Sequence, residues 1–377
     1  MADNKDKKAL NVPALRFPEF CGEWEKCKFG DIATGFDYGM NAAAKPYDGQ
    51  NKYIRITDID EASSTYNNED VVSPDGTLSE NYTVNERDIL LARTGASTGK
   101  SYLYRKSDGK LYYAGFLIRA NIAEHNPYFV FSQLHTHRYW RWVSIMSARS
   151  GQPGINSQEY ASFPIYTTTL IEENKISTLL SLIDERIATQ NKIIDKLETL
   201  IKGIIETVIS SQKPKTVIKD CLECNSSILQ ESQVAENGSF PVYGATGISG
   251  YTETADVNGE SILIIKDGSG VGTVKFVTGE YSYIGTLNRL IAKDSYCLKY
   301  IYFALQGFSF EPYKTGMAIP HIYFKDYGRA KIFCPTIEKQ SAIAQKLSSI
   351  EDKVSVEKQI LFYYQAQKSY LLSQMLI

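Results

Sequence analysis

The feature that most constrains the fold of this 377-residue chain is an internal repeat. A short apolar strand, a basic residue and two glycines four positions apart occur at residues 89–99 and again at 262–272. An aromatic–glycine–leucine stretch (113–117 and 283–287), a basic glycine turn (149–153 and 314–318) and a tyrosine before a long helix (Tyr160 and Tyr327) follow in the same order. Because repeated landmarks in one order require a repeated fold, we predict two copies of one domain.

Each half ends in a long heptad pattern. Apolar residues recur at alternating steps of four and three from Ile176 to Val208, and adding 167 to each number gives a matching series from Ile343 to Met375. Such a stripe is too narrow for a globular core face and too long to stay in water, so we predict two helices that pair antiparallel. The expected pairing residues are Ile176, Leu180, Ile183, Ile187, Ile194 and Leu197 in the first helix and Ile343, Leu347, Ile350, Val354, Leu361 and Tyr364 in the second.

Two polar residues interrupt these stripes at matching positions, Gln190 and Glu357. They either fix the register of the pair or mark a hydrated position near mid-helix, and the pattern does not distinguish the two.

These patterns predict an α+β protein. Two duplicated mixed α/β domains are separated by two long antiparallel coiled-coil helices with pseudo-twofold symmetry. The expected segments are a first domain (1–168), a central spacer helix (169–212), a second domain (213–334) and a C-terminal spacer helix (335–377). Threonines ahead of glutamates cap both helix starts, and Pro214 ends the first helix.

The formal charge of -2 conceals a repeated polarity. Residues 1–86 hold 9 basic and 16 acidic side chains, whereas 87–168 hold 10 and 4. Residues 213–260 hold 3 and 7, whereas 261–334 hold 9 and 5. Both basic stretches are rich in aromatic residues, a mixture that suits phosphate contact and base stacking. The alternative is a solvated charged surface with buried rings.

No enzyme motif is complete in this sequence. The stretch 95–101 is one residue short of a phosphate-binding loop, 268–272 leads into a strand instead of a helix, and 126–129 only approaches a methyltransferase tetrapeptide. Of six cysteines, only Cys221 and Cys224 have metal-ligand spacing, with no second pair. We therefore expect no cofactor, no metal and no catalytic site in this chain.

The chain also shows no membrane signal. Residues 1–10 are charged, and the longest aliphatic runs, such as 262–265, are far shorter than the ~18 residues that span a bilayer. We expect a cytoplasmic protein.

Several stretches carry a family resemblance. They are the N-terminal segment 24–32 of the first repeat, the strand segments 53–59 and 240–247, and the helix starts 170–176 and 337–343. With the duplication and the closing heptad helices, the chain resembles the specificity subunit of a type I restriction-modification system. The chain departs from the family pattern at two places. Asn174 stands where the family usually shows Gln, and the second repeat lacks the tryptophan found at the start of the first.

The resemblance implies a non-catalytic, sequence-specific DNA-binding subunit. Each domain would be a target recognition domain that reads one half of a bipartite sequence in double-stranded DNA. The helices would separate the halves and bind two methylation subunits, through which restriction subunits join. S-adenosylmethionine, ATP and magnesium would belong to those partners.

Candidate DNA contacts are polar residues on loops of the basic stretches, because base edges are read by hydrogen bonds. In the first half we expect Arg93, Thr94, Ser97, Thr98, Lys100, Arg149, Ser150, Gln152 and Asn156. In the second half we expect Tyr243, Lys266, Ser269, Lys314, Thr315 and His321. The glycine turns have a purely structural alternative, the closing of hairpins.

Two other functions stay open at this stage. A DNA methyltransferase with its own recognition domains would need a cofactor site in this chain. A coiled-coil scaffold that binds no DNA would explain the helices but not the repeated charge polarity.

Overall fold

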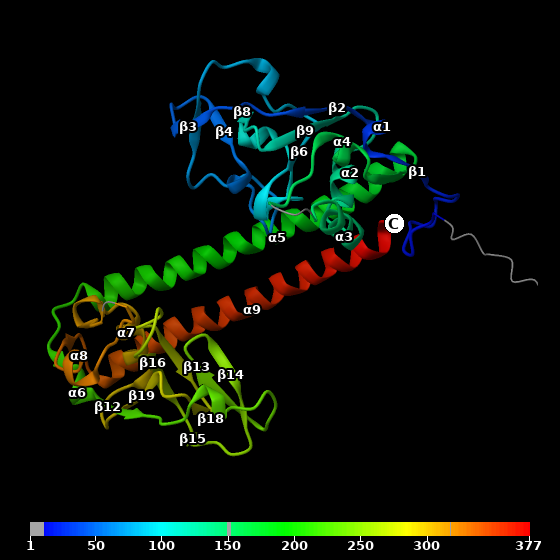
Figure 1. Ribbon diagram of the computed structural model, residues 1–377. Coiled ribbons are helices and arrows are strands. Elements are labelled where there is room, and N and C mark those ends of the chain that lie inside the picture. The colour runs from blue at the N-terminus through cyan, green and yellow to red at the C-terminus, as the bar shows by residue number, and fades with distance from the viewer. Residues whose placement is uncertain (1–10, 149–151, 317) are drawn as a thin grey trace, which may run out of the picture. The chain divides into compact units, whose positions relative to one another are not determined.

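The computed structural model describes residues 11–148, 152–316 and 318–377 (Figure 1). The chain divides into two compact units. The first unit is Met1–Thr189 together with Leu361–Ile377, and the second unit is Gln190–Ile360. Each unit therefore contains one α/β domain and parts of both long helices.

The first domain is built on a four-stranded antiparallel sheet with the order β2-β9-β6-β7. These strands are β2 (Ala33–Tyr38), β9 (Leu117–Ile122), β6 (Asp88–Ala92) and β7 (Ser101–Leu103). Three strand pairs complete the domain: β1 (Glu25–Lys28) with β10 (Pro164–Thr167), β3 (Ala43–Pro46) with β5 (Val72–Asp75), and β4 (Lys52–Ile54) with β8 (Leu111–Tyr113). Its helices are α1 (Phe29–Ile32), α2 (Pro127–Gln133), α3 (His137–Met146) and α4 (Ser157–Ala161), with short 3-10 turns at Ile56–Asp58, Glu80–Tyr82, Gly95–Ser97 and Lys106–Asp108.

The second domain repeats this plan with the sheet order β12-β19-β16-β17. These strands are β12 (Leu222–Ser226), β19 (Leu287–Ala292), β16 (Ser261–Ile265) and β17 (Val274–Val277). β11 (Thr216–Val217) pairs with β20 (Lys331–Ile332), and a further sheet has the order β14 (Gly247–Thr252), β13 (Phe240–Gly244), β18 (Glu280–Tyr283) and β15 (Val257–Asn258). Its helices are α6 (Ile218–Cys221), α7 (Leu298–Gln306) and α8 (Phe324–Tyr327), with 3-10 turns at Glu231–Gln233 and Glu311–Tyr313.

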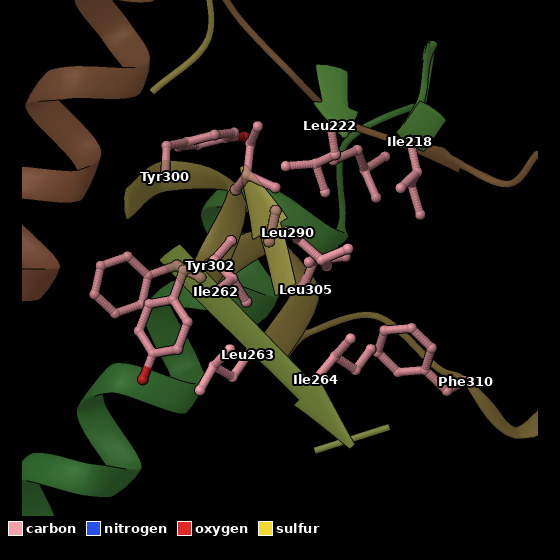
Figure 2. Close-up of a cluster of buried hydrophobic side chains, with 14 of the residues drawn as sticks. Ile218, Leu222, Ile262, Leu263, Ile264, Leu290, Tyr300, Tyr302, Leu305 and Phe310 are labelled. Carbon is pink, nitrogen blue, oxygen red and sulfur yellow. The ribbon is translucent and has the colours of Figure 1, made fainter. Parts of the chain in front are cut away.

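The core of the second domain lies between the central strand and the short helix that follows the sheet. Figure 2 shows Ile262 and Leu263 of β16 beside Tyr302 of α7, and Ile264 beside Phe310. All five side chains are buried. Every residue of β16 is buried, which explains why its sequence is a continuous apolar run instead of an alternation.

The predicted fold class is confirmed, because both domains have the same strand order and each leads into a long helix. The copies differ outside this main sheet: the first domain has the separate pairs β3–β5 and β4–β8, and the second has one sheet of β14, β13, β18 and β15. The first domain has α3 between α2 and α4, whereas the second has only the 3-10 turn Glu311–Tyr313 among the described residues between α7 and α8.

The long helices are α5 (Leu170–Ile204), which continues as a π-helical turn over Ile205–Ser210, and α9 (Ile337–Met375). In the first unit, Asp184 of α5 pairs with Lys368 of α9 at 2.6 Å, and Arg186 donates to the Tyr364 hydroxyl at 3.4 Å. The α9 number falls as the α5 number rises, so the helices run antiparallel there.

In the second unit, the same two helices meet through a polar pair and an ion pair. The Gln190 amide donates to the Glu357 backbone carbonyl at 3.1 Å and also to the Glu357 carboxylate. Lys358 pairs with Glu198 at 2.7 Å. Of the two alternatives for Gln190 and Glu357, this direct contact between the helices favours the one in which the pair fixes the register.

The expected pairing residues differ in burial. Ile176, Leu180, Ile183, Ile194, Leu347 and Val354 are buried, whereas Ile187, Leu197, Ile343, Ile350, Leu361 and Tyr364 are half-buried. The heptad pattern did not single out the ends of the helices as domain contacts. Leu371, Leu372, Met375 and Leu376 pack in one cluster with Trp24 and Phe129 of the first domain, while Ile201, Ile204, Ile205 and Ile209 pack on the core of the second.

A buried acceptor fixes the start of each long helix. In α5, the Glu173 carboxylate accepts hydrogen bonds from the Asn126 backbone N–H and from His125 Nδ1, both at 2.8 Å. In α9, the Gln340 side-chain oxygen accepts from the Cys297 backbone N–H at 3.0 Å. Asn126 and Cys297 are the N-cap residues of α2 and α7, so Glu173 is the counterpart of Gln340.

A further side chain on each long helix, acidic in both copies, binds the short helix of the adjoining domain. The Asp184 carboxylate accepts from the Tyr128 hydroxyl of α2. The Glu351 carboxylate accepts from Lys299 at 2.7 Å and from the Tyr302 hydroxyl at 2.9 Å, both from α7. Asp184 and Glu351 are 167 residues apart, the same offset as the apolar stripes, so these contacts belong to the duplicated plan.

Replacing Ile183 by aspartate tests the importance of the buried stripe. Ile183 is buried in the cluster of the first unit, and an unpaired carboxylate there should lower the free energy of unfolding by about 3 kcal/mol. The neighbouring Leu182 is half exposed, so Leu182→Asp should cost less than about 1 kcal/mol. Denaturant unfolding of both variants measures the difference, and equal costs would contradict the packing described above.

The His125–Glu173 contact predicts a pH dependence of stability. Its hydrogen bond with Glu173 raises the pKa of His125 above the ordinary value of 6.5. The stabilisation is then complete below pH 6.5 and is lost as the pH rises through the raised pKa. Burial lowers the pKa of His135 to about 4, so the effect of that residue falls below pH 6.5 and does not interfere. We expect Glu173→Gln to flatten the decline of stability above pH 6.5.

Glutamine already serves at the matching position 340, so this substitution keeps an acceptor for the Asn126 N–H. The exposed Glu124 provides a matched control, since it acts on His125 only through longer-range charge attraction. Thermal unfolding from pH 6.5 to 9 should show a flattened profile for Glu173→Gln and a largely unchanged one for Glu124→Gln. Two identical profiles would show that Glu173 does not set the pKa of His125.

Candidate nucleic-acid interface

In the first domain, a glycine turn leads from β6 to β7. Arg93 follows the buried strand β6, and the chain reverses over residues 94–99, where Gly95 and Gly99 have φ angles of +68° and +94°. The Gly95 N–H donates to the Pro153 carbonyl at 3.0 Å, and the Ile155 N–H donates to the Arg93 carbonyl at 2.9 Å. These two bonds hold the segment 153–155 beside the turn.

The second domain has the same arrangement. Lys266 follows β16, the Gly268 N–H donates to the Pro320 carbonyl at 3.0 Å, and the Ile322 N–H donates to the Lys266 carbonyl at 2.9 Å. The matching bonds make Pro320 the counterpart of Pro153. The repeat pattern, which aligned Pro153 with Ala318, was wrong by two residues at this point. We call the turn with its attached segment the clamped turn: residues 93–100 with 153–155, and residues 266–273 with 320–322.

The candidate contacts of the first half lie on or beside this clamped turn. Gln152 and Asn156 are exposed, Arg93, Thr94, Ser97 and Lys100 are half-buried, and Thr98 is buried. Arg149 and Ser150 lie outside the described residues. Some of these side chains form hydrogen bonds within the domain. The Thr98 hydroxyl donates to the Gly95 carbonyl at 2.8 Å, and the Asn156 side-chain oxygen accepts from the Glu159 N–H at 2.9 Å to cap α4.

In the second half, Ser269 and Thr315 are exposed, whereas Tyr243, Lys266, Lys314 and His321 are half-buried. His321 exchanges backbone hydrogen bonds with Thr315, and its Nδ1 lies 2.7 Å from Asp267 Oδ1. Lys314 forms an ion pair with Glu311. Except for Tyr243, which lies on β13, these residues all lie on the clamped turn or on the segment leading into it.

Tyr38 is a neighbour of the first clamped turn that the sequence analysis missed. The Arg93 guanidinium lies over the Tyr38 ring, 4.8 Å from its centroid. The Tyr38 hydroxyl accepts from the Ser157 N–H at 3.2 Å. Hydrogen bonding to Ser157, through its side chain first and then its backbone N–H, lowers the pKa of Tyr38. The ring is 41% exposed. An exposed aromatic at the end of β2 was the available signal, but nothing local connects it to a residue 55 positions later.

The aromatic residues of the basic stretches belong mainly to the core. Tyr102, Tyr112, Tyr113, Tyr139, Tyr281 and Tyr300 are at most 1% exposed. For these rings the structure supports buried packing over base stacking. In the same group, Trp140 is 43% exposed and remains on the surface.

Part of the basic excess also stabilises the fold. Arg87 donates to the backbone carbonyls of Ile122, Ala123 and His125, and Arg119 pairs with Asp37 at 3.0 Å. Lys100 pairs with Glu61 at 3.1 Å. The charge sums therefore overstate the number of cations that are available for phosphate.

Two surface hollows accompany the domains. One, of about 220 Å³, is polar and is lined by Thr34, Gly35, Asp37, Asn85, Asp88, Arg119 and Asn121. The other, of about 190 Å³, is lined by Tyr243, Gly244, Ala245, Thr246, Gly247, Leu263, Ile265, Thr273, Lys275 and Leu287.

Across the described residues, no group of three or more His, Cys, Asp or Glu side chains is arranged to hold a metal ion. No helix in the described ranges is long and apolar enough to cross a membrane.

Comparison with known proteins identifies the class. A family model for the type I restriction modification DNA specificity domain matches the chain twice, over residues 22–199 and 216–362. The chain therefore belongs to the family of type I restriction-modification specificity subunits. No match was found among curated proteins.

Two solved structures have a similar fold. The S subunit of a type I restriction-modification system from M. genitalium has 16% sequence identity and a TM-score of 0.69, with 97% of this chain and 99% of that chain covered. A chain from a study of complex assembly and conformational transition of the type I R-M system has 15% identity and a TM-score of 0.52, with 93% and 96% covered.

Replacing Gly99 by alanine tests the packing of the first clamped turn. A Cβ atom at Gly99 would lie 2.7 Å from Val143 Cγ1 and 2.9 Å from Trp140 Cζ3, both on α3. Gly279 has a similar φ of +88° but nothing within 4 Å of its Cβ position. Both substitutions strain the backbone, and Gly99→Ala should cost about 1–3 kcal/mol more because of overpacking. Denaturant unfolding gives both values, and similar losses would place α3 away from the turn.

Proposed function

We propose that this protein is the sequence-specific DNA-binding subunit of a type I restriction-modification complex and that it reads a bipartite target. The observation that carries the proposal is the duplicated clamped turn, which presents a basic residue after a buried strand in both domains. Two recognition sites with the same backbone arrangement suit a DNA target of two sequence blocks separated by unread base pairs. We place the recognition domains at 1–168 and 213–334 and the spacer helices at 169–212 and 335–377.

The subunit itself would be non-catalytic. Each of the three partial enzyme motifs has a structural role: residues 95–101 and 268–272 connect β6 to β7 and β16 to β17, and Asn126 caps α2. S-adenosylmethionine, ATP and magnesium would be bound by the partner subunits. These roles favour a DNA reader over a methyltransferase with its own recognition domains.

Two methylation subunits would dock on the paired helices, and restriction subunits would join through them. Large apolar side chains that are exposed on these helices support this docking. They are Leu170, Ile171, Leu182 and Leu200 on α5 and Ile337, Val356, Phe362, Tyr363 and Tyr370 on α9. Exposed apolar side chains gathered on one element are typical of protein interfaces. With DNA as its substrate, the complex would work in the cytoplasm.

The decisive experiment is co-purification with the products of the neighbouring genes, followed by selection from random duplex DNA. We expect a complex with methylation subunits that selects two short blocks at a constant gap. A continuous selected target would contradict the bipartite proposal, and a complex that binds no duplex would favour a scaffold without DNA contacts.

Spacer length gives a further prediction. α5 has 35 residues, or about 53 Å at 1.5 Å per residue, which corresponds to about 15 base pairs at 3.4 Å per step. With allowance for the base pairs that each domain covers, we propose that the helices set an unread gap of roughly 5–8 base pairs. One extra heptad in both helices keeps the stripes in phase and adds about 10 Å, or about three base pairs. Repeating the selection should give the same two blocks with a longer gap. A heptad in one helix only would break the pairing and is the control. An unchanged gap would show that the helices do not set it.

A further inference from the structure

We propose that Arg93 and Lys266 are a matched pair of contacts to DNA phosphate, one in each recognition domain. The inference rests on the proposed function and deepens it, because it assigns a ligand group to two particular side chains. It also separates residues that position the protein on DNA from residues that read bases.

The backbone groups of Arg93 and Lys266 form equivalent hydrogen bonds. The Arg93 N–H donates to the Phe116 carbonyl at 3.0 Å, and the Lys266 N–H donates to the Thr286 carbonyl at 2.9 Å. Together with the bonds from Ile155 and Ile322, both polar backbone groups of each residue are paired in the same way. The two cations are thus presented from the same point of the same scaffold.

Both side-chain cations are available to bind an external anion. In the described part of the chain, neither the Arg93 guanidinium nor the Lys266 ammonium has a hydrogen-bond or ion-pair partner. The nearby Lys100, in contrast, is neutralised by Glu61, and Lys314 by Glu311. Both Arg93 and Lys266 are half-buried, which limits their motion while their charge remains unmatched. An unmatched, restrained cation next to solvent is well suited to an external anion.

The surroundings of the two cations differ. The strand registers make Ser226 the counterpart of Tyr38, and its hydroxyl donates to Asn288 instead of supporting Lys266. The residues just before the clamped segments differ as well, with exposed Gln152 matched by exposed Ile319.

Two domains that read different blocks need different side chains toward the bases. What both blocks share is the sugar–phosphate backbone, which positions a protein without carrying sequence information. A charge that both domains keep at one position therefore fits phosphate. We assign base reading to the residues that differ between the domains, with Gln152 in the first.

The test measures binding of the assembled complex, with its methylation subunits, to the selected target and to an unrelated duplex between 50 and 200 mM salt. Arg93→Ala and Lys266→Ala should each weaken binding to both duplexes by the same factor. Each should also reduce the slope of log affinity against log salt by about 0.9, and the double variant should reduce it by about 1.8. The selected sequence should not change.

Three further variants make the result specific. Arg93→Lys and Lys266→Arg keep the charge and should keep the salt slope. Lys192→Ala removes an exposed cation from α5 and should leave the slope unchanged. Arg93→Gln retains a long side chain over Tyr38 and replaces Arg93→Ala if the alanine variant does not assemble.

Two results would overturn the inference alone. One is an altered base preference in one block with an unchanged salt slope, which would make the residue a base reader. The other is unchanged affinity and slope for all neutral variants. A wild-type complex that binds no duplex would overturn the proposed function as well, so the two failures can be told apart.

Discussion

The burial of the apolar stripes of α5 and α9 is the interaction on which each unit depends. In the first unit, Ile176, Leu180 and Ile183 share one buried cluster with the end of α9 and with Trp24 and Phe129 of the domain. In the second, the end of α5 and the start of α9 both join the domain core. Helix stability in proteins comes mainly from burying an apolar face. Neither helix is therefore stable by itself, and each domain folds together with the helix segments that it buries.

Polar contacts then determine how each helix is attached. An apolar stripe alone permits sliding and rotation, whereas a buried acceptor requires a particular donor. Glu173 and Gln340 meet the N-caps of α2 and α7, and Asp184 and Glu351 accept hydrogen bonds from the same short helices. One copy uses a carboxylate where the other uses an amide, so the hydrogen-bond geometry is retained although the charge is not. Only the carboxylate couples the attachment to pH, through His125.

The candidate DNA-binding sites of the two domains likewise share a backbone arrangement and differ in their side chains. The clamped turns agree in their backbone bonds and in carrying a cation, while Tyr38, Gln152 and α3 in the first domain have no like counterpart at the matching positions of the second. A specificity subunit needs both properties, because the phosphate backbone is the same in every target and the base edges are not.

The sequence by itself determined the duplication, the two long helices, the apolar stripes and the glycine turns, because these depend on local periodicity and on the backbone freedom of glycine. The tertiary structure decided which aromatic rings are buried, which cations are neutralised, that Tyr38 supports Arg93, and that Pro153 corresponds to Pro320. These features join residues far apart in the chain through strand order and through loops that differ in length between the copies. A constant sequence offset fails across such loops, whereas paired backbone hydrogen bonds give the correspondence directly, because every buried N–H must find its acceptor.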